Sequence, residues 1–415
     1  MKMKSPTRRS VTAGLALGTL AAPALRIGSA WAQAKSVKMA MIAPLSGPWA
    51  RQGQLLRQGA DMAIDEINQK GGIQKLGGAK FELVVADAGD STEKAKNAAQ
   101  RLVAQEPDVV GGIGSWLSSF TLAVTEVTER AELPWLTLSY SDLITGRGFK
   151  YIFQTSPTAE TQATALLPRI VDLATKSGAG KPTKVAFVGD NSASSVSFMK
   201  AIRGGVAKDL GLTIVADEVF TPPLADATTL VQKIRSGRPD FIVMQSTNVG
   251  DDKLLLDKFA ERGITASTVP LVGGGGHWTV PELAKVAGKE HLEGVIVGLA
   301  NWPGKALGDL EKRFMTKTGE PWLGHDSIFP YAHVMIFKEA LERTASTDRK
   351  KLGEMLHKID LKDGPARYFP DGRVKFEENG RRVGAELCIV QWQKGRPVAV
   401  HPENIAVSKA VWPKS

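Results

Sequence analysis

The chain has 415 residues, of which 53 are Lys or Arg and 43 are Asp or Glu, and its formal net charge is +10. Residues 1–34 carry five of the basic residues and no acid, so the rest of the chain carries +5, which is too weakly basic to indicate a nucleic-acid binder. The single cysteine, Cys388, excludes an internal disulfide, and its apolar surroundings predict a buried, unreactive thiol. A remainder of about 380 residues normally divides into two domains.

The first 34 residues have the pattern of a cleaved export signal. A basic start with Arg8 and Arg9 precedes an apolar stretch over 11–27, and small residues follow it around Ala32. The arginine pair resembles a twin-arginine signal, and a general secretory signal is the alternative. A membrane anchor is not predicted, because spanning needs about 20 strongly apolar residues. We therefore expect 1–34 to be removed and the mature chain to be periplasmic.

The rest of the chain alternates short apolar runs with amphipathic helical patterns. The strand-like runs are 37–43, 81–87, 109–112 and 135–138 in a first series, and 184–188, 213–219, 241–245, 269–272 and 295–299 in a second. The helical patterns between them cover 56–67, 90–102, 118–131, 194–210 and 251–263. Strands that are apolar throughout are typical of parallel sheets covered on both faces, and their alternation with helices predicts βαβ units.

We therefore expect an α/β fold with two doubly wound parallel-sheet lobes, which divide near residues 154–157. The mostly helical segment 307–359 is expected to return to the first lobe, and strands near the C-terminus to rejoin the second. The expected lobes are 35–154 with 300–368, and 155–299 with 369–415. A chain that crosses between lobes more than once can form a hinge.

Catalytic and metal-binding signatures are missing from the sequence. The six histidines show no HExxH or similar spacing, and neither a CxxC pair nor a GxSxG elbow occurs. The glycine runs 111–114 and 273–276 complete neither a dinucleotide loop nor a Walker A motif, but they follow strands, where open α/β sheets bind ligands. We predict a protein that binds a small molecule and is not an enzyme, with no metal site and no cofactor.

The N-terminal part of the mature chain carries a specific pattern. Residues 41–48 (MIAPLSGP), Gly53, residues 64–68 (IDEIN) and the run 71–73 (GGI) resemble the branched-chain amino acid type (type I periplasmic) substrate-binding proteins of ABC transporters. The resemblance covers essentially the whole mature chain. It implies two lobes joined by three crossings, a ligand cleft between them, a monomer, and a transporter permease and ATPase as partners. A ligand-sensing receptor module of a signalling system is the alternative.

The resemblance implies first-lobe groups that grip a carboxylate. Ser118 matches a serine at the helix start after the third strand, and Ser139 and Ser141 match a hydroxyl after the fourth. Hydroxyls together with free N–H groups at a helix N-terminus suit an anion. The alternative role for Ser118 is that of a helix N-cap.

The second lobe departs from the family's pattern. Ser194 stands where amino-acid binders usually carry an aromatic residue, and Gly275, two residues before His277, stands where they carry an acid that pairs with the ligand's ammonium. A buried ammonium without a carboxylate is costly. We therefore expect a small carboxylate without a free α-ammonium, aromatic or not, or an amide, rather than an aliphatic amino acid.

Aromatic side chains on the predicted cleft loops can stack on a planar ligand, or can instead line the interface between the lobes. The remaining candidate ligand-binding residues are Trp49, Trp116 and Tyr140, with the polar Gln52, Asn248 and His277.

Overall fold

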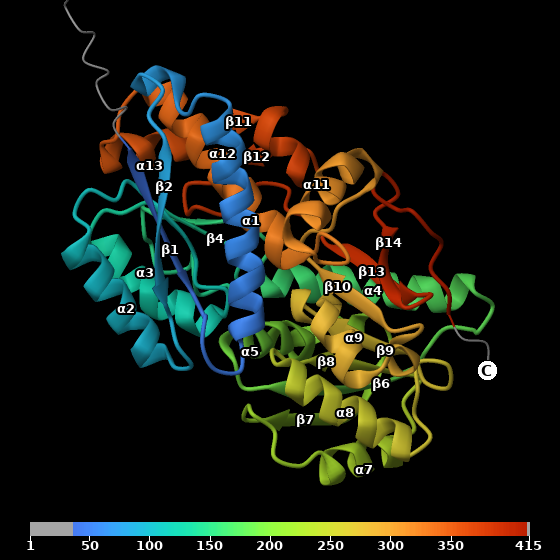
Figure 1. The fold of residues 1–415 in the computed structure, drawn as a ribbon. Coiled ribbons are helices and arrows are strands. Elements are labelled where there is room, and N and C mark those ends of the chain that lie inside the picture. The colour runs from blue at the N-terminus through green and yellow to red at the C-terminus, as the bar shows by residue number, and fades with distance from the viewer. Residues whose placement is uncertain (1–35, 413–415) are drawn as a thin grey trace, which may run out of the picture. The chain divides into compact units, whose positions relative to one another are not determined.

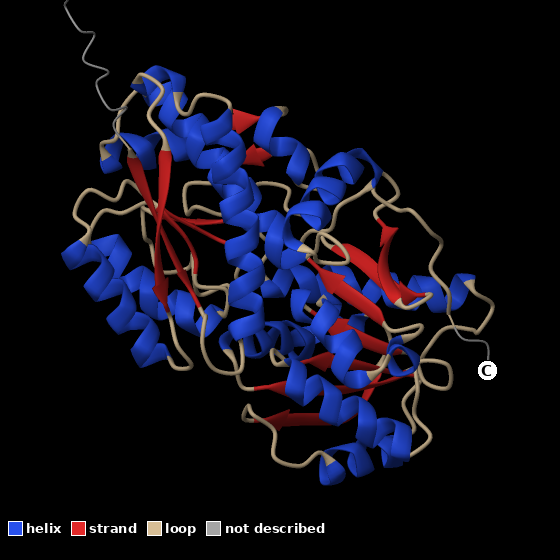
Figure 2. Ribbon diagram, in the orientation of Figure 1, coloured by secondary structure: helices blue, strands red, loops and turns tan. Residues whose placement is uncertain are grey.

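A computed structural model of the chain describes residues 36–412. The expected export signal at 1–34 and its cleavage site lie outside the described residues. Within them, no helix is both long and apolar enough to cross a membrane. The described chain forms two α/β lobes, each built on its own sheet (Figures 1 and 2). The predicted fold class is thereby confirmed.

The first lobe is built on a five-stranded parallel sheet in the order β2-β1-β3-β4-β5. Its strands are β1 (Val37–Ala43), β2 (Phe81–Asp87), β3 (Gly112–Gly114), β4 (Trp135–Thr137) and β5 (Ile152–Gln154). The helices of this lobe are α1 (Ala50–Gln69), η1 (Gln74–Leu76), α2 (Thr92–Gln105), α3 (Ser118–Arg130), η4 (Lys305–Leu307), α11 (Gly308–Thr318), α12 (His325–Thr344), α13 (Arg349–Lys358) and η5 (Gly364–Tyr368).

The packing of α1 against α12 helps to position the site. The apolar stripe of α1 from Leu56 to Ile67 is buried, as its helical spacing predicts. Gly59 lets α12 approach closely, because a Cβ there would lie 2.0 Å from the Ser327 carbonyl oxygen. This contact fixes the first turn of α12 and so brings His325 to the interface between the lobes.

The second lobe is built on a seven-stranded sheet in the order β14-β13-β10-β9-β8-β6-β7. Its strands are β6 (Lys184–Asp190), β7 (Thr213–Phe220), β8 (Phe241–Gln245), β9 (Leu271–Gly274), β10 (Ile296–Leu299), β13 (Cys388–Gln393) and β14 (Arg396–His401). Its helices are α4 (Ala159–Lys176), α5 (Ala193–Ala201), η2 (Ile202–Val206), α6 (Ala207–Asp209), α7 (Thr228–Gly237), α8 (Val249–Glu261), η3 (Gly276–Thr279), α9 (Pro281–Ala287) and α10 (Lys289–Leu292). The strands β6 to β10 pair in parallel, whereas β13 pairs antiparallel with both β10 and β14. Cys388 is buried in β13, and burial raises the pKa of its thiol.

Three elements of the structure are not revealed by the apolar pattern of the sequence. The strand β5 has only three residues. The helix α4 contains Pro168, a residue that normally interrupts helices. The strand β14 lies at the edge of its sheet and has only two buried positions, so its apolar signal is weak.

The chain passes between the lobes three times: after β5, after β10 and before β13. A small antiparallel pair, β11 (Asp360–Leu361) and β12 (Val374–Lys375), holds the segment that precedes the last crossing. Phe369, Val374 and Phe376 pack in the core of the first lobe. The return to the second lobe therefore comes after residue 376, later than the expected position at 369.

Candidate functional site

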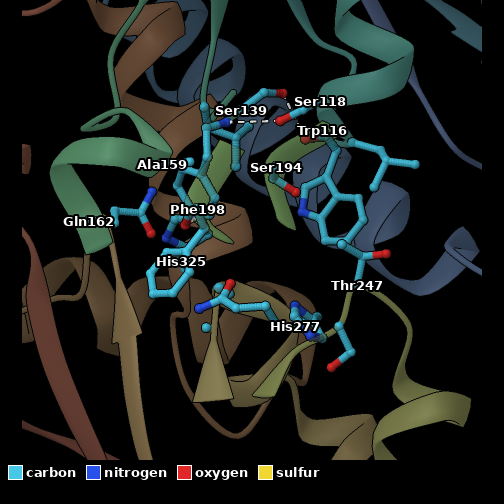
Figure 3. A pocket seen from close by; sticks show the side chains of 18 residues that line it. Trp116, Ser118, Ser139, Ala159, Gln162, Ser194, Phe198, Thr247, His277 and His325 are labelled. Carbon is cyan, nitrogen blue, oxygen red and sulfur yellow. Dashed lines mark hydrogen bonds between the residues drawn. The ribbon is translucent and has the colours of Figure 1, made fainter. Parts of the chain in front are cut away.

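A cavity lies between the lobes, where the loops after β3, β4, β8 and β9 meet (Figure 3). Open α/β sheets bind ligands at these strand ends. Seven of the predicted residues line the cavity: Trp116, Ser118, Ser139, Tyr140, Ser194, Gly275 and His277. The other lining residues are Leu117, Leu138, Ala159, Gln162, Phe198, Gln245, Ser246, Thr247, Gly274, Gly276 and His325. Among the described residues that line the cavity, none is Asp, Glu, Lys or Arg.

The loop between β3 and α3 holds an unusual backbone conformation. Ser115 and Trp116 have φ angles of 68° and 37°, directly after Gly114 at 105°. Positive φ is rare for residues other than glycine and costs energy, and such residues cluster at ligand sites. The Ser115 N–H donates to the Ile42 carbonyl at 2.6 Å, which ties the loop to β1. This loop presents Trp116 and Ser118 to the cavity.

The Ser118 hydroxyl is arranged to donate a hydrogen bond. Its Oγ accepts the backbone N–H groups of Tyr140 and Ser141, both at 3.1 Å. With both lone pairs occupied, the hydroxyl hydrogen is the group left for a ligand. The N-cap of α3 is Leu117, so the N-cap alternative for Ser118 is wrong. The hydroxyl and the first N–H groups of α3 form a donor set that suits an oxygen anion.

Ser139 lines the cavity, but its hydroxyl is already used within the protein. Its Oγ donates to the Trp116 carbonyl at 2.7 Å. It also lies 2.6 Å from the Thr121 hydroxyl and accepts the Thr137 hydroxyl at 3.0 Å. Ser139 therefore braces the β3–α3 loop, and of the two first-lobe serines that line the cavity, Ser118 is the one whose hydroxyl hydrogen remains available.

Tyr140 and His325 form a neutral pair at the cavity wall. The Tyr140 Oη lies 3.0 Å from the His325 Nε2. Burial lowers the pKa of His325 to about 3, so its imidazole is uncharged. Burial also raises the pKa of Tyr140 well above its ordinary value, so the phenol keeps its proton. The pair adds polarity to the cavity without adding charge.

His277 enters the cavity from η3 in the second lobe and forms a buried pair with Asp252 of α8. The His277 Nε2 lies 3.2 Å from the Asp252 Oδ2, and the two side chains are 3% and 0% exposed. Burial by itself lowers the pKa of His277, but the nearby carboxylates, Asp252 first, outweigh it and raise that pKa. The Trp116 ring from the first lobe meets the imidazole edge-on, with 6.4 Å between centroids.

Three glycines of the run 273–276 leave room for the side chains of the cavity wall. A Cβ at Gly274 would lie 2.1 Å from the Gln245 Nε2, and a Cβ at Gly276 would lie 2.4 Å from the His325 Cδ2. Gly275 has a φ of 104°, which disfavours any side chain. The position at which the resemblance implies an acid is therefore closed to one by the backbone itself.

Asp326 lies behind the cavity wall. Its Oδ1 accepts the Trp116 Nε1–H at 2.9 Å, and its Oδ2 has no partner within residues 36–412. Burial raises the pKa of Asp326 to about 6. The carboxyl therefore holds the indole in place and does not face the cavity.

Four predicted ligand-binding residues do not line the cavity. The Trp49 Nε1–H donates to the Thr247 carbonyl in the other lobe at 3.0 Å. The Ser141 hydroxyl lies 3.0 Å from that of Ser197, also in the other lobe. Asn248 is the N-cap of α8. Gln52 is fully buried, and its side-chain amide has no partner in the described part of the chain.

Several lining residues are not among those predicted from the sequence. Gln245 and Thr247 follow a predicted strand, so the rule that ligands gather at strand ends is the signal that points to them. Gln162 and Phe198 sit on helices, and helical spacing does not mark them. His325 is 185 residues from Tyr140, its partner, and only the packing of α12 brings the two together. Within residues 36–412, no group of three or more His, Cys, Asp or Glu residues is placed to hold a metal ion.

The sequence profile of the family described as "Periplasmic binding protein" matches residues 36–397. A relative from Brucella melitensis biotype 1, the Leu/Ile/Val-binding protein homolog 7, is 30% identical over 407 residues, which cover 95% of this chain and 98% of the relative.

Solved structures share the fold at lower identity. The branched-chain amino acid transporter substrate binding protein LivJ of Streptococcus pneumoniae, in complex with isoleucine, aligns with a TM-score of 0.73 and 21% identity over 88% of this chain and 100% of that one. A solute binding protein of an ABC transporter from Rhodopseudomonas palustris BisB5, in complex with 3,4-dihydroxybenzoic acid, aligns with a TM-score of 0.74 and 19% identity over 89% and 98% of the two chains.

Proposed function

The chain belongs to the periplasmic binding protein family, and on this basis we propose that it captures one small molecule outside the cytoplasm and delivers it to an ABC importer. The family consists of solute-binding proteins of transporters. A membrane permease and its ATPase are the partners in this proposal, and cleavage of residues 1–34 releases the mature chain into the periplasm.

The ligand that we propose is a small carboxylate or amide without a free α-ammonium. The observation that carries this is the Ser118 hydroxyl, whose oxygen already accepts two backbone N–H groups and whose hydrogen remains for a ligand oxygen. The second lobe supports the same choice, because the described residues that line the cavity include no carboxylate to pair with an ammonium.

Aromatic side chains make a planar ligand a good fit. Trp116, Tyr140 and Phe198 all line the cavity and come from both lobes. Flat apolar rings of this kind favour stacking or edge contacts with a planar group. Among the ligands of the proposed class, an aromatic acid would therefore contact the largest part of the cavity wall.

A thermal-shift panel tests the proposal. Leucine and isoleucine represent aliphatic amino acids, and 4-methyl-2-oxopentanoate, benzoate, 3,4-dihydroxybenzoate and benzamide represent the proposed class. A ligand at a hundred times its Kd should stabilise the chain by about 2.7 kcal/mol. We expect a rise in Tm with a member of the second group, and a smaller rise with Ser118→Ala. A rise with leucine or isoleucine and none with the acids or the amide would contradict the proposal.

A further inference from the structure

We propose that His277 is the group of the second lobe that binds the ligand, and that it donates a hydrogen bond from Nδ1 to a ligand oxygen. This rests on the proposed function, because it concerns the same cavity. It narrows the ligand to acids that carry a second acceptor oxygen, such as 2-oxo acids and hydroxy-substituted aromatic acids. It also explains how the cavity rejects an ammonium.

The orientation of the imidazole leaves one nitrogen for the cavity. Within residues 36–412, the ion-pair contact of the ring is made by Nε2, which faces Asp252 at 3.2 Å. The opposite nitrogen, Nδ1, lies beside Gly275, where a Cβ would stand 3.2 Å from it. Both Gly275 and His277 line the cavity, and Figure 3 shows His277 across the cavity from Ser118. Ser118 and His277 thus present donors from the two lobes to opposite sides of the cavity.

The acidic groups around His277 are held by the protein. Asp252 accepts the Ser246 hydroxyl. Asp190, at the end of β6, accepts the Thr247 hydroxyl at 2.5 Å. Asp326, at the start of α12, accepts the Trp116 indole, as described above. Asp251 of α8 accepts the Leu224 N–H at 2.8 Å, and the remaining titratable neighbour, His325, is neutral.

These buried carboxylates favour the protonated imidazole, and they oppose the burial that lowers its pKa. None of them lines the cavity, so a ligand meets the N–H of the imidazolium rather than a carboxylate. An acceptor oxygen satisfies that N–H, whereas an ammonium would set two cationic donors against each other. Asp252 is a positioning residue in this arrangement, because it acts on the ligand through His277.

A matched pair of ligands isolates this choice. Leucine and 4-methyl-2-oxopentanoate share one carbon skeleton. They differ at the second carbon, where leucine carries an ammonium and the oxo acid carries a carbonyl oxygen. Isothermal titration calorimetry of the mature chain with this pair and with 3,4-dihydroxybenzoate, from pH 6 to pH 8.5, measures the preference. Buffers of different ionisation enthalpy measure the protons taken up on binding. We expect the oxo acid to bind at least tenfold more tightly than leucine. We also expect proton uptake above the pKa of His277, where affinity falls by about tenfold per pH unit.

Three variants complete the experiment. His277→Gln should bring the two affinities within about threefold and abolish proton uptake, because a neutral amide either donates or accepts. Asp252→Asn should move the fall in affinity to lower pH, which a merely structural role would not do. His291→Gln is the matched control, since His291 lies 3.5 Å from Asp257 in the same lobe but does not line the cavity. It should change neither readout.

The outcomes separate this inference from the proposed function. The inference is overturned if leucine binds as tightly as the oxo acid, or if His277→Gln keeps both the preference for the oxo acid and the proton uptake. Either result leaves the proposed delivery of a solute to an importer unaffected. It is also overturned if the thermal-shift panel finds a ligand whose only oxygens are those of one carboxylate. A chain that binds none of the acids or amides loses the proposed ligand class, and this inference with it.

Discussion

The indole of Trp49 joins the two lobes without entering the cavity. Its Nε1–H donates to the buried Thr247 carbonyl, and its ring meets Phe120 edge-on at 5.5 Å. Trp49→Phe keeps an aromatic ring and removes the donor. In the closed form the Thr247 carbonyl then lacks this partner, which costs about 1–3 kcal/mol, whereas water hydrates both groups once the lobes separate. The Kd of the ligand should therefore rise by roughly 5- to 150-fold.

Calorimetry and stopped-flow kinetics measure this effect with any ligand that the thermal-shift panel identifies. We expect faster dissociation with nearly unchanged association, because the lost bond forms only on closure. Trp392→Phe is the matched control, since its Nε1–H donates to the Trp278 carbonyl at 2.9 Å within the second lobe. It should lower Tm and leave Kd close to that of the parent chain. An unchanged Kd in Trp49→Phe, or an equal rise in the control, would refute the reasoning.

Four further substitutions test other parts of the site. Ser118→Ala should weaken carboxylate binding by roughly 10- to 150-fold, because a hydrogen bond to a charged group contributes about 1.5–3 kcal/mol. Ser139→Ala should lower Tm but change ligand affinity little, since the Ser139 hydroxyl is bound to the Trp116 carbonyl. Calorimetry and melting curves on the Ser118 and Ser139 variants test this contrast. Equal ligand affinities of the two variants would count against it. Gly276→Ala should weaken binding at least about tenfold without lowering the Tm of the unliganded chain, because the new Cβ would stand 2.4 Å from the His325 Cδ2 across the interface. Solution scattering should show that the lobes of the Gly276→Ala variant stay apart when ligand is added. Closure like that of the parent chain would argue against a clash between the new Cβ and His325. Asp326→Asn should raise Tm at pH 8 and not at pH 4. The pKa of the buried carboxyl is raised from 3.8 to about 6, so its stabilising contribution is present below pH 4 and is lost as the pH rises through 6. That shift corresponds to at most about 3 kcal/mol, and an equal change in Tm at both pH values would exclude this explanation.

Strand ends were the most informative feature of the sequence. Apolar runs of four to seven residues indicate strands buried on both faces, and the side chains that follow such runs collect at one edge of a parallel sheet. Tyr140 and the glycine run that includes Gly275 are predicted in this way, whereas the family resemblance singles out Ser118, and all three residues line the cavity. The rule works because the strand direction alone fixes where these residues lie.

Residues that reach the cavity from helices escaped prediction for a physical reason. His325 is the first residue of α12, a helix that is buried on nearly all sides and so has no polar face to read. Its place depends on the close contact at Gly59, which is a property of two helices far apart in the sequence. Gln162 sits on α4, whose helical pattern is interrupted by Pro168. Local sequence patterns do not predict such contacts, because they depend on how distant segments of the chain pack together.

The loops that carry Trp49 and Ser141 do reach the interface between the lobes, but a loop position does not determine which partner a side chain takes. Both side chains bond to the opposite lobe, and so does Ser119, whose hydroxyl accepts the Ala193 N–H at 3.2 Å. These bonds are made in the arrangement that this structure holds, so they favour it over a form with separated lobes, whatever the ligand is. The ligand then needs to supply only the remaining free energy of closure, and any change in the closed population changes the apparent affinity by the same factor. Under the proposed function, affinity is therefore shared between the cavity, where we propose that Ser118 and His277 select the ligand, and the contacts around it, which set how tightly any selected ligand is held.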